Sequence, residues 1–348
     1  MAEPPPPLPA ANDPSVSYTG RTRVNADGTR SFDWVTQIHL NVVNASFVRA
    51  TINATGGILG RFISEVDGWE VSSFYVGGGN GALATNDFLI ADDLYATRHI
   101  RLIQTLEPGF AGAHEGALFT FVGFTTDGKA AAPTPRTRSI ELVGDSISAG
   151  YGARGHAGTP YGCPVDDNTS GNYFTYNWML AEAFSADLTV IAWSGKGMYQ
   201  NCCDNGERMP SYYLQTLAGD AYSTDWTFPS APDLLLVNLG TNDFGHDSGP
   251  AWEANFTTTY VQFVLNATAR YRKPKLPVFV AQGPMNDGAP LYNALQAAIR
   301  GINAAGGAAT YLDMRGPPND GCGGHPGVEG HSQMFAMAKP QIAKVMGW

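Results

Sequence analysis

Hydrophobic and polar positions alternate with a period of two in the N-terminal third of the chain. Runs of this kind include Ser31–Val42, His99–Ile103 and Ala117–Val122, and glycine-rich clusters such as Gly77–Gly81 lie between them. This period is typical of strands with one buried face, and short strands separated by turns favour a β-sandwich. We therefore predict a β-sandwich domain over residues 16–126.

From residue 139 onward, apolar strand-like runs alternate with helix-like segments. The strand-like runs are Ile140–Val143, Leu188–Ala192, Leu234–Leu239, Val278–Ala281 and Thr310–Leu312. The helix-like segments are Tyr173–Phe184, Trp252–Tyr271, Leu291–Ala304 and Val328–Met346. This alternation predicts an α/β domain with a parallel sheet of about five strands and helices on both faces. We expect it to span residues 139–348, after an alanine- and proline-rich linker at residues 127–138.

The N-terminal residues 1–15 are rich in proline, beginning Met1-Ala-Glu-Pro-Pro-Pro-Pro-Leu-Pro9. They lack the basic start and the apolar stretch of a signal peptide. We expect a disordered tail with polyproline-II character.

The formal charge is −10, and 43% of the residues are apolar. No run of lysine or arginine is present, so neither nucleic acid nor an anionic membrane surface is an expected partner. No apolar stretch approaches the ~20 residues that a membrane-spanning helix needs. We expect a monomer without nucleic-acid or membrane partners.

The segment Arg138–Ser148 carries the strongest chemical signal. Its apolar strand ends at Gly144, and Asp145 and Ser146 follow at the predicted start of a helix. Glycine permits a tight turn, and N–H groups at a helix start can stabilise negative charge beside the serine hydroxyl. This geometry suits a nucleophile, although a Gly-Asp-Ser turn by itself is more often structural.

Three later motifs follow strand-like runs, and they contain Gly195 (Ser-Gly-Lys-Gly), Asn242 (Gly-Thr-Asn-Asp) and His325 (Gly-His-Pro). Ligands of open parallel sheets bind beyond the carboxyl ends of the strands, so we expect these residues to meet Ser146 at one edge. The four motifs together resemble the SGNH (GDSL-type) hydrolases. The Gly-x-Ser-x-Gly elbow of the α/β-hydrolase fold is absent.

Less specific motifs are spread over nearly the whole chain, and with them the chain resembles carbohydrate esterase family 2. They are Tyr18-Thr-Gly-Arg21, Phe32-Asp-Trp34, Asn201-Cys-Cys203, and His331 after His325-Pro326. The resemblance implies a jelly-roll N-terminal domain and a flavodoxin-like SGNH domain. It also implies an acetyl xylan esterase-like serine enzyme that removes acetyl groups from plant polysaccharides such as xylan or glucomannan. We expect no cofactor and no metal.

In this mechanism Ser146 attacks the ester carbonyl and carries the acyl group. His325 takes the serine proton and later returns it to the leaving sugar oxygen. The backbone N–H groups of Ser146 and Gly195 and the side-chain amide of Asn242 would form the oxyanion hole.

Several neighbouring residues have a structural interpretation as well. Asp145 and Asp243 suit turn-capping, and His331 is the competing histidine but lies inside the last helix. Aromatic residues beside the motifs fit sugar stacking and internal packing equally well: Tyr151, Tyr161, Trp193 and Tyr199.

The acid of the catalytic triad is missing from its usual place. In SGNH enzymes it lies three residues before the histidine, or two in carbohydrate esterase family 2, where this chain has Cys322 and Gly323. Asp320 lies five residues before His325 and is the candidate third member. We instead predict a Ser146–His325 dyad in which a backbone carbonyl near Gly323 accepts the second ring N–H.

The four cysteines are Cys163, Cys202, Cys203 and Cys322. They lack the spacing of a zinc site and lie in loops next to the motifs, so we expect two disulfides rather than buried thiols. We predict one bridge from Cys322 to Cys202 or Cys203, and the other from Cys163 to the remaining cysteine.

Five Asn-x-Ser/Thr sequons are present, which exceeds the two or three expected by chance and suggests a secreted glycoprotein. The candidate sites are Asn44, Asn53, Asn168, Asn255 and Asn266. We expect an extracellular protein, whose signal peptide is not in this chain.

Two other functions remain open from the residues alone. A non-catalytic carbohydrate-binding protein would have a similar composition, although Ser146 and His325 argue against it. An SGNH esterase or lipase acting on small or lipid esters would need an apolar groove for the acyl chain.

Overall fold

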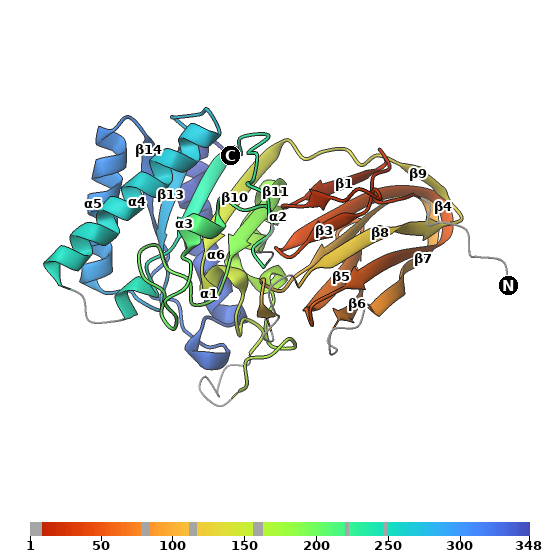
Figure 1. The fold of residues 1–348 in the computed structure, drawn as a ribbon, viewed down its shortest axis with the longest axis horizontal. Helices are drawn as coiled ribbons and strands as arrows, with labels where there is room; N and C mark the ends of the chain where they lie inside the picture. Colours follow the sequence, from red (N-terminus) through yellow and green to blue (C-terminus); the bar gives the residue numbers. More distant parts are fainter. Residues whose placement is uncertain (1–8, 78–83, 111–116, 156–162, 220–222, 246–248) are drawn as a thin grey trace. The chain divides into compact units, whose positions relative to one another are not determined.

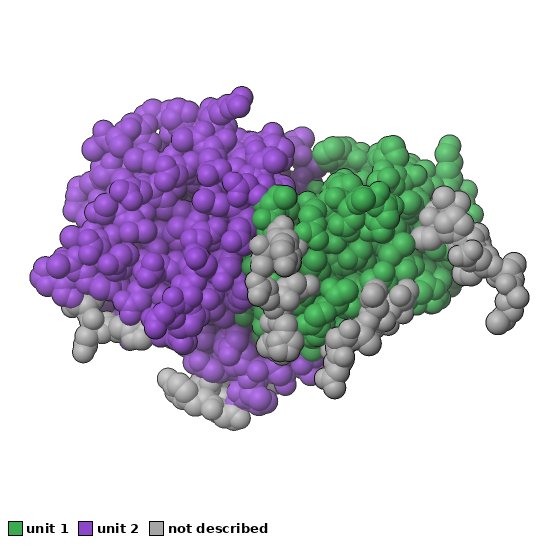
Figure 2. Space-filling view, in the orientation of Figure 1, with its two compact units in different colours: residues 1–135, 216–224 green, residues 136–215, 225–348 purple. Residues whose placement is uncertain are grey.

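The structure is a computed structural model that describes residues 9–77, 84–110, 117–155, 163–219, 223–245 and 249–348. The chain divides into two compact units. Unit 1 comprises residues 1–135 and 216–224, and unit 2 comprises residues 136–215 and 225–348 (Figure 2).

Unit 1 contains nine antiparallel strands among its described residues. They are β1 Val16–Thr19, β2 Arg23–Val24, β3 Arg30–Phe32, β4 Thr36–Ala54, β5 Leu59–Val66, β6 Trp69–Gly77, β7 Ala84–Gln104, β8 Phe119–Thr126 and β9 Lys129–Ala131. The hydrogen-bonded order is β2-β3-β8-β4-β7-β5-β6, and β1 and β9 also pair with β4. The first half of β4 thus lies beside β1 and β9 and its second half beside β8, with register shifts at residues 43–45 and 48–49. Such bulges bend and twist a strand, so one continuous sheet folds over its own core.

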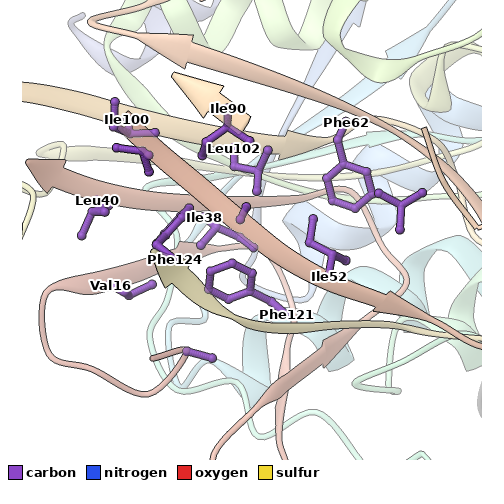
Figure 3. Close-up of a cluster of buried hydrophobic side chains, with 14 of the residues drawn as sticks. Val16, Ile38, Leu40, Ile52, Phe62, Ile90, Ile100, Leu102, Phe121 and Phe124 are labelled. Carbon is purple, nitrogen blue, oxygen red and sulfur yellow. The ribbon is translucent and has the colours of Figure 1, made fainter. Parts of the chain in front are cut away.

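The core of unit 1 follows from the alternation in these strands. Ile38, Leu40 and Val42 of β4 and Ile100 and Leu102 of β7 are almost fully buried in one hydrophobic cluster. Figure 3 shows Ile38, Leu40, Ile100 and Leu102 in this cluster, with the aromatic rings of Phe62 from β5 and of Phe121 and Phe124 from β8. The predicted β-sandwich is confirmed.

Three boundaries of unit 1 differ from the sequence prediction. Residues 9–15 of the predicted tail are in contact with the sheet, because Pro9 and Ala11 exchange backbone hydrogen bonds with β8, whereas residues 1–8 lie outside the described residues. The expected linker contains β9, which pairs with Asn41–Val43. Residues 216–224 also join this unit, where the Gly219 N–H donates to Asp33 over 2.6 Å. All three segments are short and are held by partners distant in sequence, which local patterns do not report.

Unit 2 contains a five-stranded parallel sheet (Figure 1). Its strands are β10 Arg138–Gly144, β11 Ala186–Ala192, β12 Leu234–Asn238, β13 Pro277–Gln282 and β14 Ala308–Asp313. The order β11-β10-β12-β13-β14 is that of a flavodoxin-like sheet. The order reverses at β10, so the crevice for a ligand opens beyond the carboxyl ends of β10 and its neighbours.

The helices of unit 2 are α1 Ser146–Ala149, α2 Tyr176–Phe184, α3 Met209–Tyr212, α4 Pro250–Arg270, α5 Ala289–Ala304 and α6 Val328–Met346. Single 3₁₀ turns lie at Asn172–Phe174, Asp243–Gly245 and Cys322–Gly324. Helices α2 and α6 contact each other, as do α4 and α5. All four predicted helices are present, with boundaries within three residues. No helix in the described part of the chain is long and apolar enough to cross a membrane.

Candidate active site

Ser146 is the first residue of α1, directly after β10. The carboxylate of Asp145 caps this helix by accepting from the Ile147 N–H at 3.1 Å. A Cβ on Gly144 would lie 2.4 Å from the Ser148 hydroxyl oxygen, so this turn requires glycine. The strand, the glycine and the cap together fix Ser146 at the carboxyl edge of the sheet.

A buried network of polar side chains contacts α1 and holds it in place. The sequence prediction did not include this network. The Ser148 hydroxyl lies 3.0 Å from the Tyr176 hydroxyl, which also accepts from the Asn238 amide at 3.1 Å. The side-chain amides of Asn172 and Asn177 both donate to the Ser148 carbonyl, at 2.7 and 3.0 Å. All five residues are at most 2% exposed. Buried groups that satisfy one another in this way give the nucleophile helix one position.

His325 contacts Ser146 through one ring nitrogen and a backbone carbonyl through the other. Its Nε2 lies 2.8 Å from the Ser146 hydroxyl oxygen, and its Nδ1 lies 3.0 Å from the carbonyl oxygen of Gly323. A carbonyl can only accept, so Nδ1 carries the proton and Nε2 is left to accept from the serine. Burial lowers the pKa of His325, and the hydrogen bond to Gly323 partly opposes this shift. The imidazole is therefore a neutral base at pH 7.

Asp320 points away from His325. Its carboxylate accepts from the backbone N–H groups of Gly327 and Gly330, at 2.8 and 3.0 Å, at the start of α6. The competing His331 is buried, stacks on Tyr176 and lies 3.4 Å from the Tyr176 N–H. Burial lowers the pKa of His331 to about 3, so this ring stays neutral. Both residues have structural partners of their own.

The expected oxyanion donors lie at the ends of three adjacent strands. Ser146 follows β10, Gly195 follows β11 and Asn242 follows β12, and β10 pairs with both other strands. The Asn242 amide donates to the Lys196 carbonyl at 2.8 Å, which places Asn242 beside the glycine motif. Gly195 has a φ of +77°, a left-handed conformation that favours glycine.

Asp243 anchors the segment that follows Gly195. It is fully buried and accepts from the N–H groups of Met198, Tyr199 and Gln200, at 2.9, 2.6 and 2.8 Å. Burial raises the pKa of this carboxyl, while the three hydrogen bonds lower it. Asp243 thereby fixes the loop that carries Gly195.

The two disulfides join Cys163 to Cys322 and Cys202 to Cys203. Two bridges were expected, but the predicted pairing is wrong. The backbone of the segment after α1 lies directly against Cys322, whose N–H donates to the Gly152 carbonyl at 3.0 Å. This approach brings Cys163 to Cys322 and leaves the two adjacent cysteines to each other.

The remaining candidates differ in exposure. Four sequon asparagines are exposed, whereas Asn53 of β4 is half-buried.

The Tyr151 ring lies 4.9 Å from that of His325, and Tyr161 lies outside the described residues. Within the described part of the chain, no three histidine, cysteine or acidic side chains lie close enough together to hold a metal ion.

Sequence and structure comparisons each match nearly the whole chain to known proteins. The chain is 27% identical to the cellulase/esterase CelE of Acetivibrio thermocellus over 98% of its own length, but it spans 40% of that protein. It is 23% identical to an acetylxylan esterase/glucomannan deacetylase of Cellvibrio japonicus, covering 97% of this chain and 91% of that protein. A family two carbohydrate esterase from Clostridium thermocellum, solved with cellohexaose, superimposes with a TM-score of 0.83 at 24% identity, covering 96% of this chain and 99% of that one.

The part of the chain that carries the candidate active site also matches the model of a known protein family. The model of the GDSL-like lipase/acylhydrolase family matches residues 142–333, a span that includes Ser146, Gly195, Asn242 and His325. The match covers more than half of the chain, and the chain therefore belongs to the GDSL-like lipase/acylhydrolase family.

Proposed function

We propose that the protein is a secreted serine esterase that removes O-acetyl groups from plant cell-wall polysaccharides through an acyl-enzyme intermediate. The observation that carries this proposal is the Ser146–His325 pair, with 2.8 Å between hydroxyl and imidazole in an acylhydrolase family. The names of the relatives, an acetylxylan esterase/glucomannan deacetylase among them, support an acetylated sugar polymer as the substrate.

In the first half of the reaction, Ser146 attacks the ester carbonyl as its proton passes to Nε2 of His325. The resulting imidazolium donates through Nδ1 to the Gly323 carbonyl and through Nε2 to the departing sugar oxygen. In the second half, water attacks the acetyl-serine while His325 again accepts and returns the proton.

Negative charge develops on the former carbonyl oxygen in both halves. The N–H groups of Ser146 and Gly195 and the second N–H of the Asn242 amide are the donors for this oxygen. Donors fixed in advance are more effective than water, because they need no rearrangement during the reaction. The caps and hydrogen bonds at Asp145, Lys196 and Asp243 hold them in place.

The direct test of the function is acetate release from acetylated xylan, glucomannan and pectin. Acetate from at least one of these polymers supports the proposal, provided that Ser146→Ala releases it at least about 10⁴-fold more slowly. Binding of the polymers without acetate release would instead favour the carbohydrate-binding alternative.

Acetyl esters should be cleaved faster than long-chain esters. The proposed acetyl specificity requires a closed acyl pocket, in which each added methylene is accommodated or rejected at a cost of ~1–3 kcal/mol. The comparison is kcat/KM for nitrophenyl acetate and nitrophenyl octanoate. Faster cleavage of the octanoate would favour the lipid-ester alternative.

Catalysis should persist at pH values below the ordinary histidine pKa of 6.5. The neutral form of His325 is the base, and burial lowers its pKa, so protonation and loss of activity require a more acidic solution. We expect the acidic limb of the pH profile of kcat/KM to have its midpoint below 6.5. A midpoint above about pH 7 would contradict the environment described for this ring.

Replacing Asp320 with asparagine should lower kcat/KM by less than roughly tenfold, or ~1.4 kcal/mol. The carboxylate holds the start of α6 and does not contact His325, and asparagine retains one oxygen acceptor for the Gly327 and Gly330 N–H groups. A loss of a thousandfold or more would instead show that Asp320 orients the histidine.

A further inference from the structure

The residue three positions before His325 is part of a cross-link. This is the position at which the resemblance to SGNH enzymes puts the acid of the triad, and here it holds Cys322. Its side chain is fully buried and bonded to Cys163, which lies in the segment after the nucleophile helix α1. Disulfide sulfur carries no charge and accepts hydrogen bonds weakly, so Cys322 cannot act on the imidazole through its side chain.

We propose that the Cys163–Cys322 disulfide is a positioning element for the catalytic histidine. It holds the Gly323 carbonyl in the place from which that carbonyl accepts the Nδ1–H of His325. This inference rests on the proposed function for its effect on catalysis, but the effect on the histidine ring is measurable without any substrate.

The backbone around Cys322 is clamped as tightly as its side chain. The Cys322 N–H donates to the Gly152 carbonyl at 3.0 Å. A Cβ on Gly155 would lie 2.5 Å from both the amide nitrogen and the Sγ of Cys322, and one on Gly152 would lie 2.4 Å from the Cys322 carbonyl oxygen. The segment after the nucleophile thus packs against Cys322 with no room for an intervening side chain, and the disulfide locks this contact.

Gly323 and Gly324, the two residues between Cys322 and His325, have little conformational preference of their own. Gly323 and Gly324 have φ values of +62° and +72°, and Gly323 is exposed. A glycine pair samples many conformations unless both of its ends are held. At the far end the His325 carbonyl accepts from the Gly321 N–H at 2.8 Å, and at the near end the disulfide and the hydrogen bond to Gly152 both hold Cys322. In this proposal the backbone contacts alone leave the glycine pair room to turn, and the cross-link fixes the direction of the Gly323 carbonyl.

The carbonyl direction sets the tautomer of His325. With the carbonyl in place, Nδ1 is protonated and Nε2 accepts from Ser146. If the turn relaxes, the alternative tautomer, with the proton on Nε2, becomes populated and cannot accept the serine proton. The wrong tautomer can cost ~10⁴-fold in kcat when it predominates.

The test is the double substitution Cys163→Ala/Cys322→Ala in the full chain. Nitrogen-15 NMR distinguishes a protonated ring nitrogen from an unprotonated one, and the His325 signals are those that disappear in His325→Asn. We expect the wild-type ring to be almost entirely in the Nδ1–H form and the double variant to be a mixture of tautomers. With nitrophenyl acetate as the substrate, kcat of the double variant should fall roughly thirtyfold, while KM changes less than about threefold. This loss is smaller than the ~10⁴-fold loss of a fully wrong tautomer, because only part of the population changes tautomer.

Two controls separate positioning from general stability. Ile342→Ala removes a fully buried side chain of α6 and lowers stability elsewhere in the same unit. At equal loss of melting temperature it should leave the His325 tautomer and kcat unchanged. If the double variant does not fold, Cys202→Ala/Cys203→Ala provides a protein in which Cys163–Cys322 is the one remaining bridge. A phosphine reductant added to this folded protein breaks that bridge. The NMR spectra before and after reduction are then compared.

The outcomes are distinct. A single Nδ1–H tautomer and an unchanged kcat after loss of the disulfide would overturn the positioning proposal, even if the esterase is fully active. A tautomer mixture after its loss would support positioning, even if no acetylated polymer proved to be a substrate. Equal changes in Ile342→Ala would assign the effect to stability and also overturn the proposal.

Discussion

Replacing Ser146 with alanine should lower kcat by at least about 10⁴-fold, because the covalent route through the acyl-enzyme is then closed. The residual rate would come from the oxyanion donors, which polarise the ester carbonyl for direct attack by water. Removal of the hydroxyl creates almost no cavity, and the Asp145 cap and the Ser148 network remain, so the fold should be unchanged. The measurement is kcat on nitrophenyl acetate at saturating substrate, together with circular dichroism.

Two further observations make the Ser146 experiment specific. Ser73→Ala, at an exposed position of β6 in unit 1, is the matched control and should retain full activity. A serine-directed phosphonate should add one label to the wild-type chain, located by peptide mapping at Ser146, and none to Ser146→Ala. A variant that kept more than about a tenth of the wild-type kcat would remove Ser146 from the mechanism.

Replacing Asn242 with alanine should lower kcat by about 10²–10³-fold with a small change in KM, because an oxyanion donor acts mainly in the transition state. One amide hydrogen of Asn242 already binds the Lys196 carbonyl, so the other is the donor for the developing charge. The variant also removes a link to the glycine motif, and some of the loss would come from a looser Gly195. Asn12→Ala, at an exposed position of unit 1, is the matched control.

The comparison of Asn242→Ala with Asn242→Asp separates the two roles of the side chain. Aspartate keeps the size of the residue but has no N–H and places a negative charge beside the oxyanion, so it should lose at least as much kcat as alanine. If Asn242→Ala raised KM at constant kcat, the amide would be binding the ground state, and the oxyanion assignment would be wrong.

Local sequence pattern was sufficient for the elements that are buried or amphipathic along their length. The strands of unit 2 are covered on both faces, so they appear as continuous apolar runs, and all five were predicted. Helix α6 was predicted from Val328 to Met346, which are its observed ends. Short elements such as β9 and α3 escaped prediction, because three or four residues carry too little periodicity.

The positions of Ser146, Gly195, Asn242 and His325 followed from chain order, because the carboxyl ends of parallel strands share one edge. Even the hydrogen bond from His325 to the Gly323 carbonyl was foreseen, since no side chain near His325 offered a better acceptor. The resemblance of the ordered motifs pointed to the family, hydrophobic patterning predicted the sandwich and the α/β unit, and chain order named the four residues that we propose for catalysis.

Only the tertiary structure decided which distant groups meet. The network of Ser148, Tyr176 and Asn238 joins three segments with no shared motif. The pairing of Cys163 with Cys322 spans 159 residues, and it depends on backbone contact at Gly152 and Gly155 that no spacing rule reveals. Local pattern records what each segment buries, whereas these contacts depend on how the segments pack together. That packing also places the Asp320 carboxylate at the start of α6 rather than beside His325.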